Sequence, residues 1–337
     1  MYNIIKGDIE GIFEKIDFTE LKDKSILITG ASGLVGVYMV SCLKEIYKDL
    51  NIKIYVWVRN EIDSKFIELF DDCYVIKKDI TERSSFNDLP NFDYIIHAAG
   101  YGQPGKFLEN KIKTIEINTT STINLFNKLN IGGKFLFVST SELYSGLDFD
   151  SIDEYQIGTT NTNHPRSCYI EGKRCGESIC YAYRQMGIDV KIARLSLAYG
   201  PGTKKDDNRV LNSIIQKGLF DENIKLMDQG DAVRTYCYIT DVIEMFWNIL
   251  FFGKENLYNV GGESVISILG LAKIIGNEFN KEVILPNVTQ VLNGSPKIVN
   301  ISIDRYLKEF KKNNFTTLQD GVEKTIKWQK FLYDKTS

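Results

Sequence analysis

An apolar run that breaks into three evenly spaced glycines limits the possible folds of this chain more than any other feature. Residues 26–29 are mostly apolar, glycines follow at 30, 33 and 36, and a helical pattern comes next. Glycines let the backbone approach a pyrophosphate, which then lies at the positive N-terminus of the helix. A strand before and a helix after favour a dinucleotide-binding loop over an ordinary glycine-rich turn. The candidate cofactor-binding residues here are Gly30, Ser32, Gly33, Leu34, Val35 and Gly36.

Strand and helix patterns alternate beyond this loop and predict an α/β fold with a Rossmann-type, doubly wound parallel sheet. Strands are expected over 52–58, 73–76, 93–97, 135–140 and 189–195, and helices over 37–47, 111–129 and 167–186. We expect residues 25–196 to form the dinucleotide-binding domain, to which 237–262 returns. Residues 197–236 and 263–337 are expected to form a smaller C-terminal α/β lobe that binds the substrate.

Residues 1–24 carry apolar side chains at helical spacing and are expected to form an N-terminal helical extension. We expect this helix to pack on the outside of the sheet, with a role in oligomer contacts as the alternative.

Tyr169 and Lys173 stand four residues apart in a segment with helical periodicity. Side chains at this spacing share one face of a helix, so the ammonium can lie close to the phenol oxygen. A nearby positive charge favours the phenolate, which would lower the tyrosine pKa from its reference value of about 10 and make Tyr169 a usable base. Such pairs also occur on solvated helix faces, so the spacing by itself does not establish catalysis.

The expected strand over 135–140 ends in hydroxyl groups and a carboxylate, at Thr140, Ser141 and Glu142. In an open parallel sheet, ligands bind beyond the carboxyl ends of the strands. These side chains are therefore candidates for the chemistry, although Glu142 could also be a loop carboxylate exposed to water.

Composition excludes several classes of function. The chain has 337 residues, 43% of them hydrophobic, and a net charge of -3, so nucleic acid is not an expected partner. No apolar run approaches the length of about 18 residues that suggests a membrane span, and no signal peptide opens the chain, so we expect no membrane contact and a cytoplasmic location. The six cysteines form no C-x-x-C pair and the two histidines lack metal-ligand spacing, which predicts reduced cysteines and no metal site.

In their order along the chain, these segments resemble the extended short-chain dehydrogenase/reductase family, specifically its nucleotide-sugar-modifying branch. The resemblance covers nearly the whole chain. Residues 139–144 (STSELY), 168–174 (CYIEGKR) and 180–183 (CYAY) are most similar to the UDP-glucuronate decarboxylases within that branch. The resemblance implies that Thr140, Tyr169 and Lys173 form a catalytic triad and that Glu142 assists it.

The resemblance also implies NAD as the cofactor. Besides the glycine loop, the residues expected around it are Arg59, Asp79, Ile80, Ala98, Ala99, Asn118, Tyr169 and Lys173. Dinucleotide sites often place an Asp for the adenosine ribose where this chain has Arg59, which could accept the 2'-phosphate of NADP, stack on the adenine or face solvent. NAD is favoured because the expected reaction regenerates its own cofactor, and NADP is not excluded. Asp79 could contact the adenine or serve as a turn residue, whereas His97 is expected to be a packed strand residue.

Two arginines, Arg209 and Arg234, are expected to bind the substrate together with Ser141 and Glu142. A planar guanidinium binds a diphosphate or a carboxylate through paired hydrogen bonds, although either arginine could be a surface salt-bridge partner instead. Relatives commonly have an Asn at the place of Leu197 that hydrogen-bonds the nucleotide diphosphate. Leucine cannot donate that bond, so other groups must hold the diphosphate here or the substrate is unusual.

These features favour an enzyme that oxidises the C4 hydroxyl of a nucleotide sugar, with Tyr169 as the base. The resemblance implies a UDP-linked substrate, decarboxylation of UDP-glucuronate to a UDP-4-keto-pentose or UDP-pentose, a role in polysaccharide biosynthesis, and a homodimer. A 4-epimerase, a 4,6-dehydratase and a 4-dehydrogenase share the first step. Dehydration ranks lower because dehydratases usually have an Asp where this chain has Ser141. A non-catalytic dinucleotide sensor is disfavoured because Tyr169 and Lys173 are both present.

Overall fold

Seven parallel strands form the central sheet of the computed structural model, which describes residues 2–147, 149, 151–287 and 297–334. Their order is β10-β6-β5-β4-β1-β2-β3, and every neighbouring pair is parallel. The strands are β1 (Ser25–Thr29), β2 (Lys53–Val58), β3 (Tyr74–Lys77), β4 (Phe92–His97), β5 (Leu129–Thr140), β6 (Asp189–Leu195) and β10 (Leu257–Val260). The chain starts in the middle of the sheet and extends it towards both edges, so the predicted Rossmann-type, doubly wound fold is confirmed.

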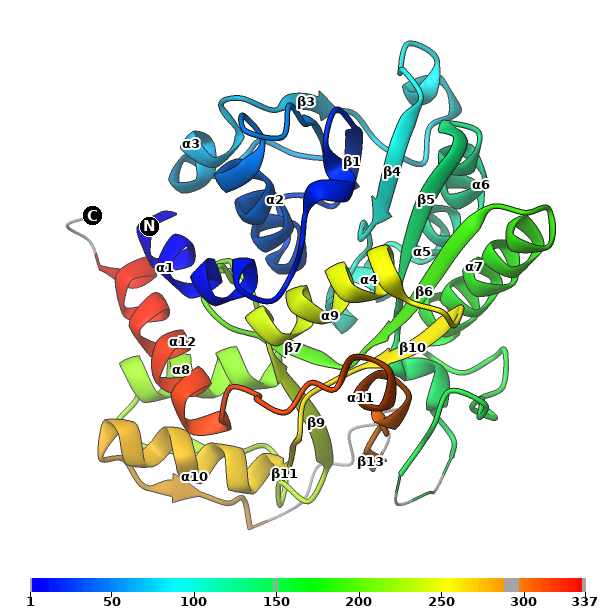
Figure 1. The fold of residues 1–337 in the computed structure, drawn as a ribbon. Helices are drawn as coiled ribbons and strands as arrows, with labels where there is room; N and C mark the ends of the chain where they lie inside the picture. The colour runs from blue at the N-terminus through cyan, green and yellow to red at the C-terminus, as the bar shows by residue number, and fades with distance from the viewer. Residues whose placement is uncertain (1, 148, 150, 288–296, 335–337) are drawn as a thin grey trace.

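Helices cover both faces of this sheet (Figure 1). One face carries α1 (Tyr2–Phe13), α2 (Leu34–Ile46) and α9 (Ile239–Phe252), and the other carries α5 (Lys111–Asn118), α6 (Thr120–Phe126) and α7 (Ser167–Gln185). Successive residues of β1 divide between the two faces, because Ile26 and Ile28 belong to one hydrophobic core and Leu27 to the other. Strands buried on both sides need apolar residues at nearly every position, which explains the uninterrupted apolar run in the sequence.

The helix predicted over 111–129 is in fact two helices, α5 and α6. Thr119 leaves the helical conformation with φ -115° and ψ -82°, within a run of Thr and Ser residues. Hydroxyl side chains compete for backbone groups and so weaken a helix interior. The Ser121 hydroxyl instead donates to the Ile80 carbonyl oxygen at 2.8 Å, which fixes the start of α6 against the loop after β3.

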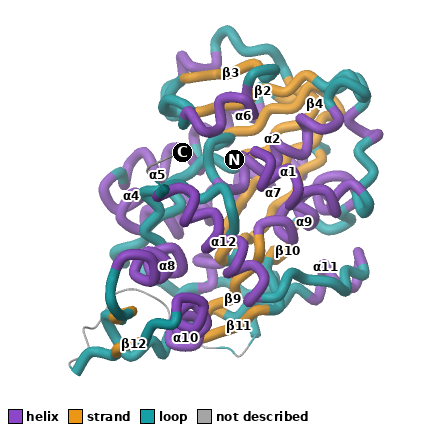
Figure 2. The backbone as a smooth tube through the Cα atoms, turned by 90° about the vertical axis from the view of Figure 1, so that its left-hand side faces the viewer, coloured by secondary structure: helices purple, strands orange, loops and turns teal. Residues whose placement is uncertain are grey.

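A smaller lobe surrounds β9 (Val233–Tyr238), which pairs with β7 (Leu197–Tyr199), β11 (Ser264–Ser267) and β13 (Ile298–Val299). Figure 2 shows α8 (Val210–Phe220) and α10 (Ile268–Phe279) beside this sheet, below the central sheet. Ser267 caps α10, because its side chain accepts a hydrogen bond from the Gly270 N–H at 3.0 Å. The remaining elements are α3 (Ile67–Phe70), α4 (Pro104–Glu109), β8 (Ile224–Lys225), β12 (Val283–Ile284), α11 (Asp304–Phe310), α12 (Leu318–Tyr333) and the 3-10 helices Thr19–Leu21, Ser64–Phe66, Arg83–Phe86 and Ser141–Tyr144.

The N-terminal helix packs on the central unit, as the sequence predicts. Ile5 and Ile9 are fully buried against residues of α2 and α9. Within the described part of the chain, no helix has both the length and the apolar character needed to cross a membrane.

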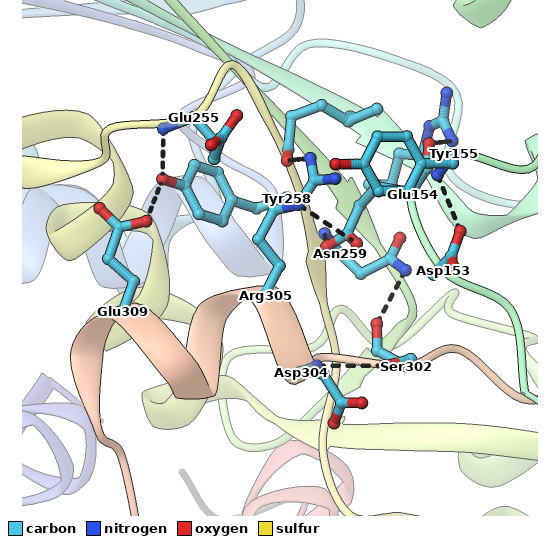
Figure 3. A network of polar contacts seen from close by, with 12 residues as sticks. Asp153, Glu154, Tyr155, Glu255, Tyr258, Asn259, Ser302, Asp304, Arg305 and Glu309 are labelled. Carbon is cyan, nitrogen blue, oxygen red and sulfur yellow. Dashed lines mark hydrogen bonds and ion pairs between the residues drawn. The ribbon is translucent and has the colours of Figure 1, made fainter.

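A polar network ties the loop after β5 to the end of the central sheet (Figure 3). The backbone N–H of Asn259 on β10 donates to the buried Glu154 carboxylate at 2.8 Å, and the Asn259 side chain donates to the Ser302 carbonyl oxygen at 2.8 Å. Arg305 lies 3.5 Å from the same carboxylate, Nε to Oε2. These contacts hold Glu154 against the end of the sheet, although the sequence around it shows no periodicity.

Candidate active site

The glycine loop fits closely around the start of α2. Gly30 has a φ of +71°, and a Cβ atom built there would lie 2.7 Å from the Ala98 carbonyl oxygen and 2.8 Å from the Ala99 Cα. A Cβ atom at Gly36 would lie 2.4 Å from the Ala31 Cα. No side chain fits at either position, so the loop backbone lies directly against the end of β4. This is the close backbone approach that a pyrophosphate site at a helix N-terminus requires.

The other predicted residues of the loop lie around the same helix start. Gly33 is the residue before α2, and its N–H donates to the Gly30 carbonyl oxygen at 2.9 Å. Leu34 and Val35 begin the helix and pack against the core. The Ser32 hydroxyl is partly exposed, with the Lys204 ammonium 3.5 Å away. The loop therefore offers backbone N–H groups and a hydroxyl to a phosphate group, and Lys204 adds a cation beside it.

The ends of β2 and β3 hold the residues predicted to meet the adenosine. The Arg59 guanidinium lies over the Tyr101 ring, 4.8 Å from its centroid, and donates to the Tyr101 hydroxyl. The Asp79 carboxylate accepts from the Thr81 N–H at 3.0 Å and from the Lys113 ammonium at 2.5 Å. Its contacts within this structure are therefore those of a turn residue.

Asn118 and His97 lie close together, at the ends of α5 and β4. The Asn118 side chain is 1% exposed and donates to the Thr114 carbonyl oxygen at 2.7 Å, while its own amide oxygen has no partner among the described residues. His97 is fully buried between Thr29 and Ile117, and burial lowers its pKa to about 3. A neutral, enclosed imidazole agrees with the prediction of a packed strand residue.

The predicted catalytic side chains converge where α7 crosses the carboxyl end of β5. The Thr140 hydroxyl accepts from the Glu142 N–H at 3.2 Å and lies close enough to the Tyr169 phenol to act on its pKa. The Lys173 ammonium, on the next turn of α7, donates to the Val138 carbonyl oxygen at 2.6 Å. Ser141 follows Thr140 and is 6% exposed. The structure therefore brings the residues of the resemblance together at one end of the sheet.

The prediction that the pKa of Tyr169 is lowered is wrong, because the pKa is raised. Burial raises the pKa of the Tyr169 phenol to about 12, with Glu142 acting in the same direction, while Thr140, Arg209 and Arg166 act against it. Burial also lowers the pKa of Lys173 to about 8. The spacing predicts an effect of Lys173, whereas the cations that act on the phenol are Arg209 and Arg166, and removal of the phenol from water outweighs them.

Glu142 is held by an arginine that sequence reasoning missed. The Arg166 guanidinium lies 2.6 Å from the carboxylate, Nη1 to Oε1, and both side chains are mostly buried. Glu142 Oε2 is also buried and has no hydrogen-bond partner among the described residues. The carboxylate is therefore not the exposed loop residue that was the alternative. Arg166 precedes Tyr169 by three residues, so helical spacing could have identified it.

Phe107 of α4 is a second residue that the sequence did not single out. Its ring stacks on the Tyr169 ring with a centroid distance of 4.8 Å and an angle of 6°. The Arg166 guanidinium lies 5.9 Å from the same ring centroid. Phe107 thus contacts both the phenol ring and the guanidinium and restricts their orientation.

Two arginines of the second lobe face this cluster. Arg209 binds the buried Asp207 carboxylate, with an Nη2 to Oδ2 distance of 2.6 Å, and is close enough to favour ionisation of Tyr169. The Arg234 guanidinium donates to the Val233 carbonyl oxygen at 2.7 Å. Burial lowers the pKa of Arg234, and Arg166 and Glu142 are among the charges that act on it. Neither arginine is a simple surface ion pair.

A parallel sheet with a glycine cradle, and a tyrosine, a threonine and a lysine at the end of its fifth strand, define a dinucleotide-dependent enzyme of the Rossmann class. The chain belongs to the NAD dependent epimerase/dehydratase family, whose model matches residues 26–261. NAD is therefore its cofactor, and the glycine cradle fits that group sterically.

The curated relatives share one activity in their names. UDP-glucuronic acid decarboxylase 1 of Xenopus tropicalis is 28% identical over 266 residues, which are 78% of this chain and 62% of that protein. This chain thus matches less than two thirds of that relative's length. UDP-glucuronic acid decarboxylase 6 of Arabidopsis thaliana is 31% identical over 270 residues, 78% of this chain and 75% of that protein.

Solved structures share the fold. The structure of UDP-glucuronic acid 4-epimerase from Bacillus cereus, in complex with UDP-glucuronic acid and NAD, superposes with a TM-score of 0.75 at 22% identity. The superposition covers 92% of this chain and 100% of that one. At this identity the likeness establishes architecture, including the smaller second lobe, and leaves the reaction to the residues of the site.

Proposed function

We propose that this chain oxidises the C4 hydroxyl of UDP-glucuronate and releases the C6 carboxylate as carbon dioxide. The product is a UDP-4-keto-pentose, or a UDP-pentose where the ketone is reduced before release. One observation carries the proposal: Thr140 and Tyr169 lie beside the Glu142 carboxylate, which Arg166 binds, and Lys173 follows Tyr169 by one turn of the same helix. The decarboxylase names of the relatives that match most of this chain support the same reaction.

Each side chain of the triad has a distinct task in the oxidation. When bound, NAD supplies the acceptor for the hydride from the sugar C4 and a positively charged ring. Tyr169 accepts the proton of the 4-hydroxyl, and Thr140 hydrogen-bonds the same oxygen. Lys173 lies one helical turn after Tyr169 on α7, and its ammonium, which donates to the Val138 carbonyl oxygen, would bind the nicotinamide ribose. Because burial raises the pKa of Tyr169 to about 12, the phenolate forms only when further positive charge reaches the site.

Decarboxylation follows from the chemistry of the oxidised sugar. A ketone at C4 makes the C6 carboxylate that of a β-keto acid. The C5–C6 bond then breaks, its electron pair passes into the enolate, and a proton returns to C5. Glu142 and Ser141 lie beside Thr140, where they can position the ring. Ser141 is a poor acid, so the site lacks the group that a dehydratase needs for the departing 6-hydroxyl.

A 4-epimerase acting on the same substrate is the second candidate. The Bacillus cereus enzyme, which shares this fold, binds UDP-glucuronic acid together with NAD. Epimerisation requires only the triad and the cofactor, so Glu142 and Arg166 would have no part in the reaction step itself.

The deciding experiment is incubation of the purified protein with UDP-glucuronate and NAD, followed by measurement of carbon dioxide and product mass. Loss of carbon dioxide supports the proposal. An unchanged mass indicates epimerisation, loss of water indicates dehydration, and loss of two hydrogens indicates simple oxidation. Tyr169→Phe is the matched control, because it removes only the hydroxyl; its product formation should fall to background while NAD binding is retained.

The same proposal includes a cytoplasmic homodimer that supplies a sugar donor for polysaccharide biosynthesis. All six cysteines are free, which suits a reducing compartment. Exposed apolar side chains lie on α5, including Ile112 at 69% and Ile115 at 38% exposure, beside α7. Light scattering of the wild type and of Ile112→Lys tests this part, since a dimer through these helices should dissociate in the variant.

A further inference from the structure

We infer that the Tyr236 hydroxyl donates a hydrogen bond to the diphosphate of the nucleotide-sugar substrate, between the guanidiniums of Arg209 and Arg234. This inference rests on the proposed function in one respect only, namely that the substrate is a nucleoside diphosphate derivative. It assigns a group that can take over the contact that Leu197 cannot make.

The Tyr236 hydroxyl is buried and has no partner in the part of the chain that the structure describes. The residue is 3% exposed, and its hydroxyl has no hydrogen-bond partner among the described residues. A buried polar group without a partner costs about 1–3 kcal/mol, so such groups are uncommon unless a ligand completes them. Burial raises the pKa of the phenol to about 12, so the group stays neutral and keeps its proton for donation.

The charges around this hydroxyl select the kind of ligand. Arg234 and Arg209 are the charged groups that act on the Tyr236 phenol, and both are cations. A guanidinium has only donors and cannot accept the phenol proton. The acceptor must therefore come from the ligand, and two neighbouring cations favour an anion. A diphosphate has acceptor oxygens and no donors, which matches a neutral donor between two guanidiniums.

Strand register places the hydroxyl at the position where the diphosphate contact is missing. Tyr236 on β9 is the direct partner of Leu197 on the parallel strand β7. Arg234 stands two residues earlier on β9, so its side chain projects from the same face of the small sheet. Leu197 adds no polar atom to this face, whereas Tyr236 does.

The position also suits the length of a nucleotide sugar. The reacting sugar carbon must lie beside Tyr169 of α7 and Thr140, at the carboxyl end of β5. Tyr236 belongs to the second lobe. Arg209 lies near both phenols, since its charge acts on Tyr169 and on Tyr236. The diphosphate joins sugar to nucleoside, so it is the part of the substrate that lies between the two lobes.

Tyr236→Phe tests the inference, because it removes the hydroxyl and keeps the ring. We expect the affinity for UDP, measured by calorimetry, to fall about tenfold, the loss typical of one hydrogen bond to a charged group. Binding of uridine, which has no phosphate, should change by less than twofold. Without nucleotide the variant should melt at the wild-type temperature or slightly above it, since no hydrogen bond of the free protein is lost.

Tyr199→Phe is the matched control on the neighbouring strand. The Tyr199 hydroxyl is likewise buried without a partner among the described residues, but Asp241 and Asp320 are the charged groups acting on it, and a Cβ atom at Gly321 would lie 2.3 Å from it. An acidic environment does not bind phosphate, so this variant should bind UDP like the wild type. Equal weakening in both variants would overturn the inference, because it would point to a general effect of losing a phenol.

The inference and the proposed reaction fail separately. If Tyr236→Phe binds UDP within twofold of the wild type, the inference is wrong even where the wild type decarboxylates UDP-glucuronate. If the wild type releases no carbon dioxide but Tyr236→Phe weakens UDP binding tenfold, the reaction is wrong and the inference stands. A wild type that binds none of UDP, CDP, GDP and dTDP overturns the inference directly.

Discussion

The Arg166 guanidinium lies 2.6 Å from the Glu142 carboxylate, Nη1 to Oε1, one helical turn before Tyr169. The pair joins the first turn of α7 to the end of β5, so the catalytic helix and the sheet are connected at the site itself. The second Glu142 oxygen is buried and has no hydrogen-bond partner among the described residues. An ion pair with one free carboxylate oxygen is suited to orienting a substrate group.

Arg166→Ala should lower kcat about 10- to 100-fold, because it removes a charged hydrogen bond that holds the carboxylate. In a Glu142→Gln background, Arg166→Ala should add little further loss. The control is Arg174→Ala, which breaks a neighbouring pair with Glu171 on the same helix. Full activity of Arg166→Ala would contradict the positioning role.

Phe107→Leu should reduce kcat more than it changes KM, because the variant loses the flat ring that stacks on Tyr169 at 4.8 Å. The Tyr169 ring then gains orientations in which its hydroxyl leaves Thr140. Phe126→Leu is the control: Phe126 stacks on Phe135 at 4.1 Å and on Tyr183 at 4.0 Å in the same core. Steady-state kinetics of both variants decides the matter, and equal kinetics would argue against a special role for the stack.

Gly36→Ala should abolish NAD binding, because the new methyl group would lie 2.4 Å from the Ala31 Cα and 2.5 Å from the Gly30 carbonyl oxygen. Both atoms are backbone, so the glycine loop itself would have to move. Gly7→Ala, in the middle of α1, meets nothing within 4 Å and should stabilise the protein by about 0.5–1 kcal/mol. Calorimetric titration with NAD and thermal melting measure the two outcomes. Normal NAD affinity in Gly36→Ala would show that the loop tolerates displacement.

The central sheet could be predicted from the sequence because its signals are local. The expected strand over 189–195 has the limits of β6, and the glycine loop follows β1 as its pattern requires. Both depend on apolar runs and turn residues within a few positions of one another. The break between α5 and α6 was missed, because it depends on the bond from Ser121 to the distant Ile80.

The site was harder to predict where its properties depend on burial or on distant partners. Tyr169 and Lys173 were found by spacing, but the pKa of Tyr169 moves opposite to the expected direction because desolvation cannot be read from spacing. Tyr236 was not singled out, because its importance depends on pairing with Leu197, 39 positions away in a different segment. Such pairings are made by the small sheet and have no local signal.

His97 should make the protein sensitive to acid. Burial, helped by the charge of Lys173, lowers its pKa from 6.5 to about 3. The unfolded chain therefore binds a proton below about pH 6.5 that the folded chain does not bind until about pH 3, so stability is lost as the pH falls through this range. At pH 5 the loss from this group should be about 2 kcal/mol.

The His97→Gln variant separates this effect from the titration of carboxylates. Glutamine cannot take up the proton, so the variant's free energy of unfolding should fall by about 2 kcal/mol less than that of the wild type between pH 7 and pH 5. The variant should be less stable at pH 7, because one amide cannot replace both the Thr29 and the Ile117 bonds. Urea unfolding at several pH values measures both proteins, and identical slopes for His97→Gln and wild type would mean that the buried imidazole titrates normally.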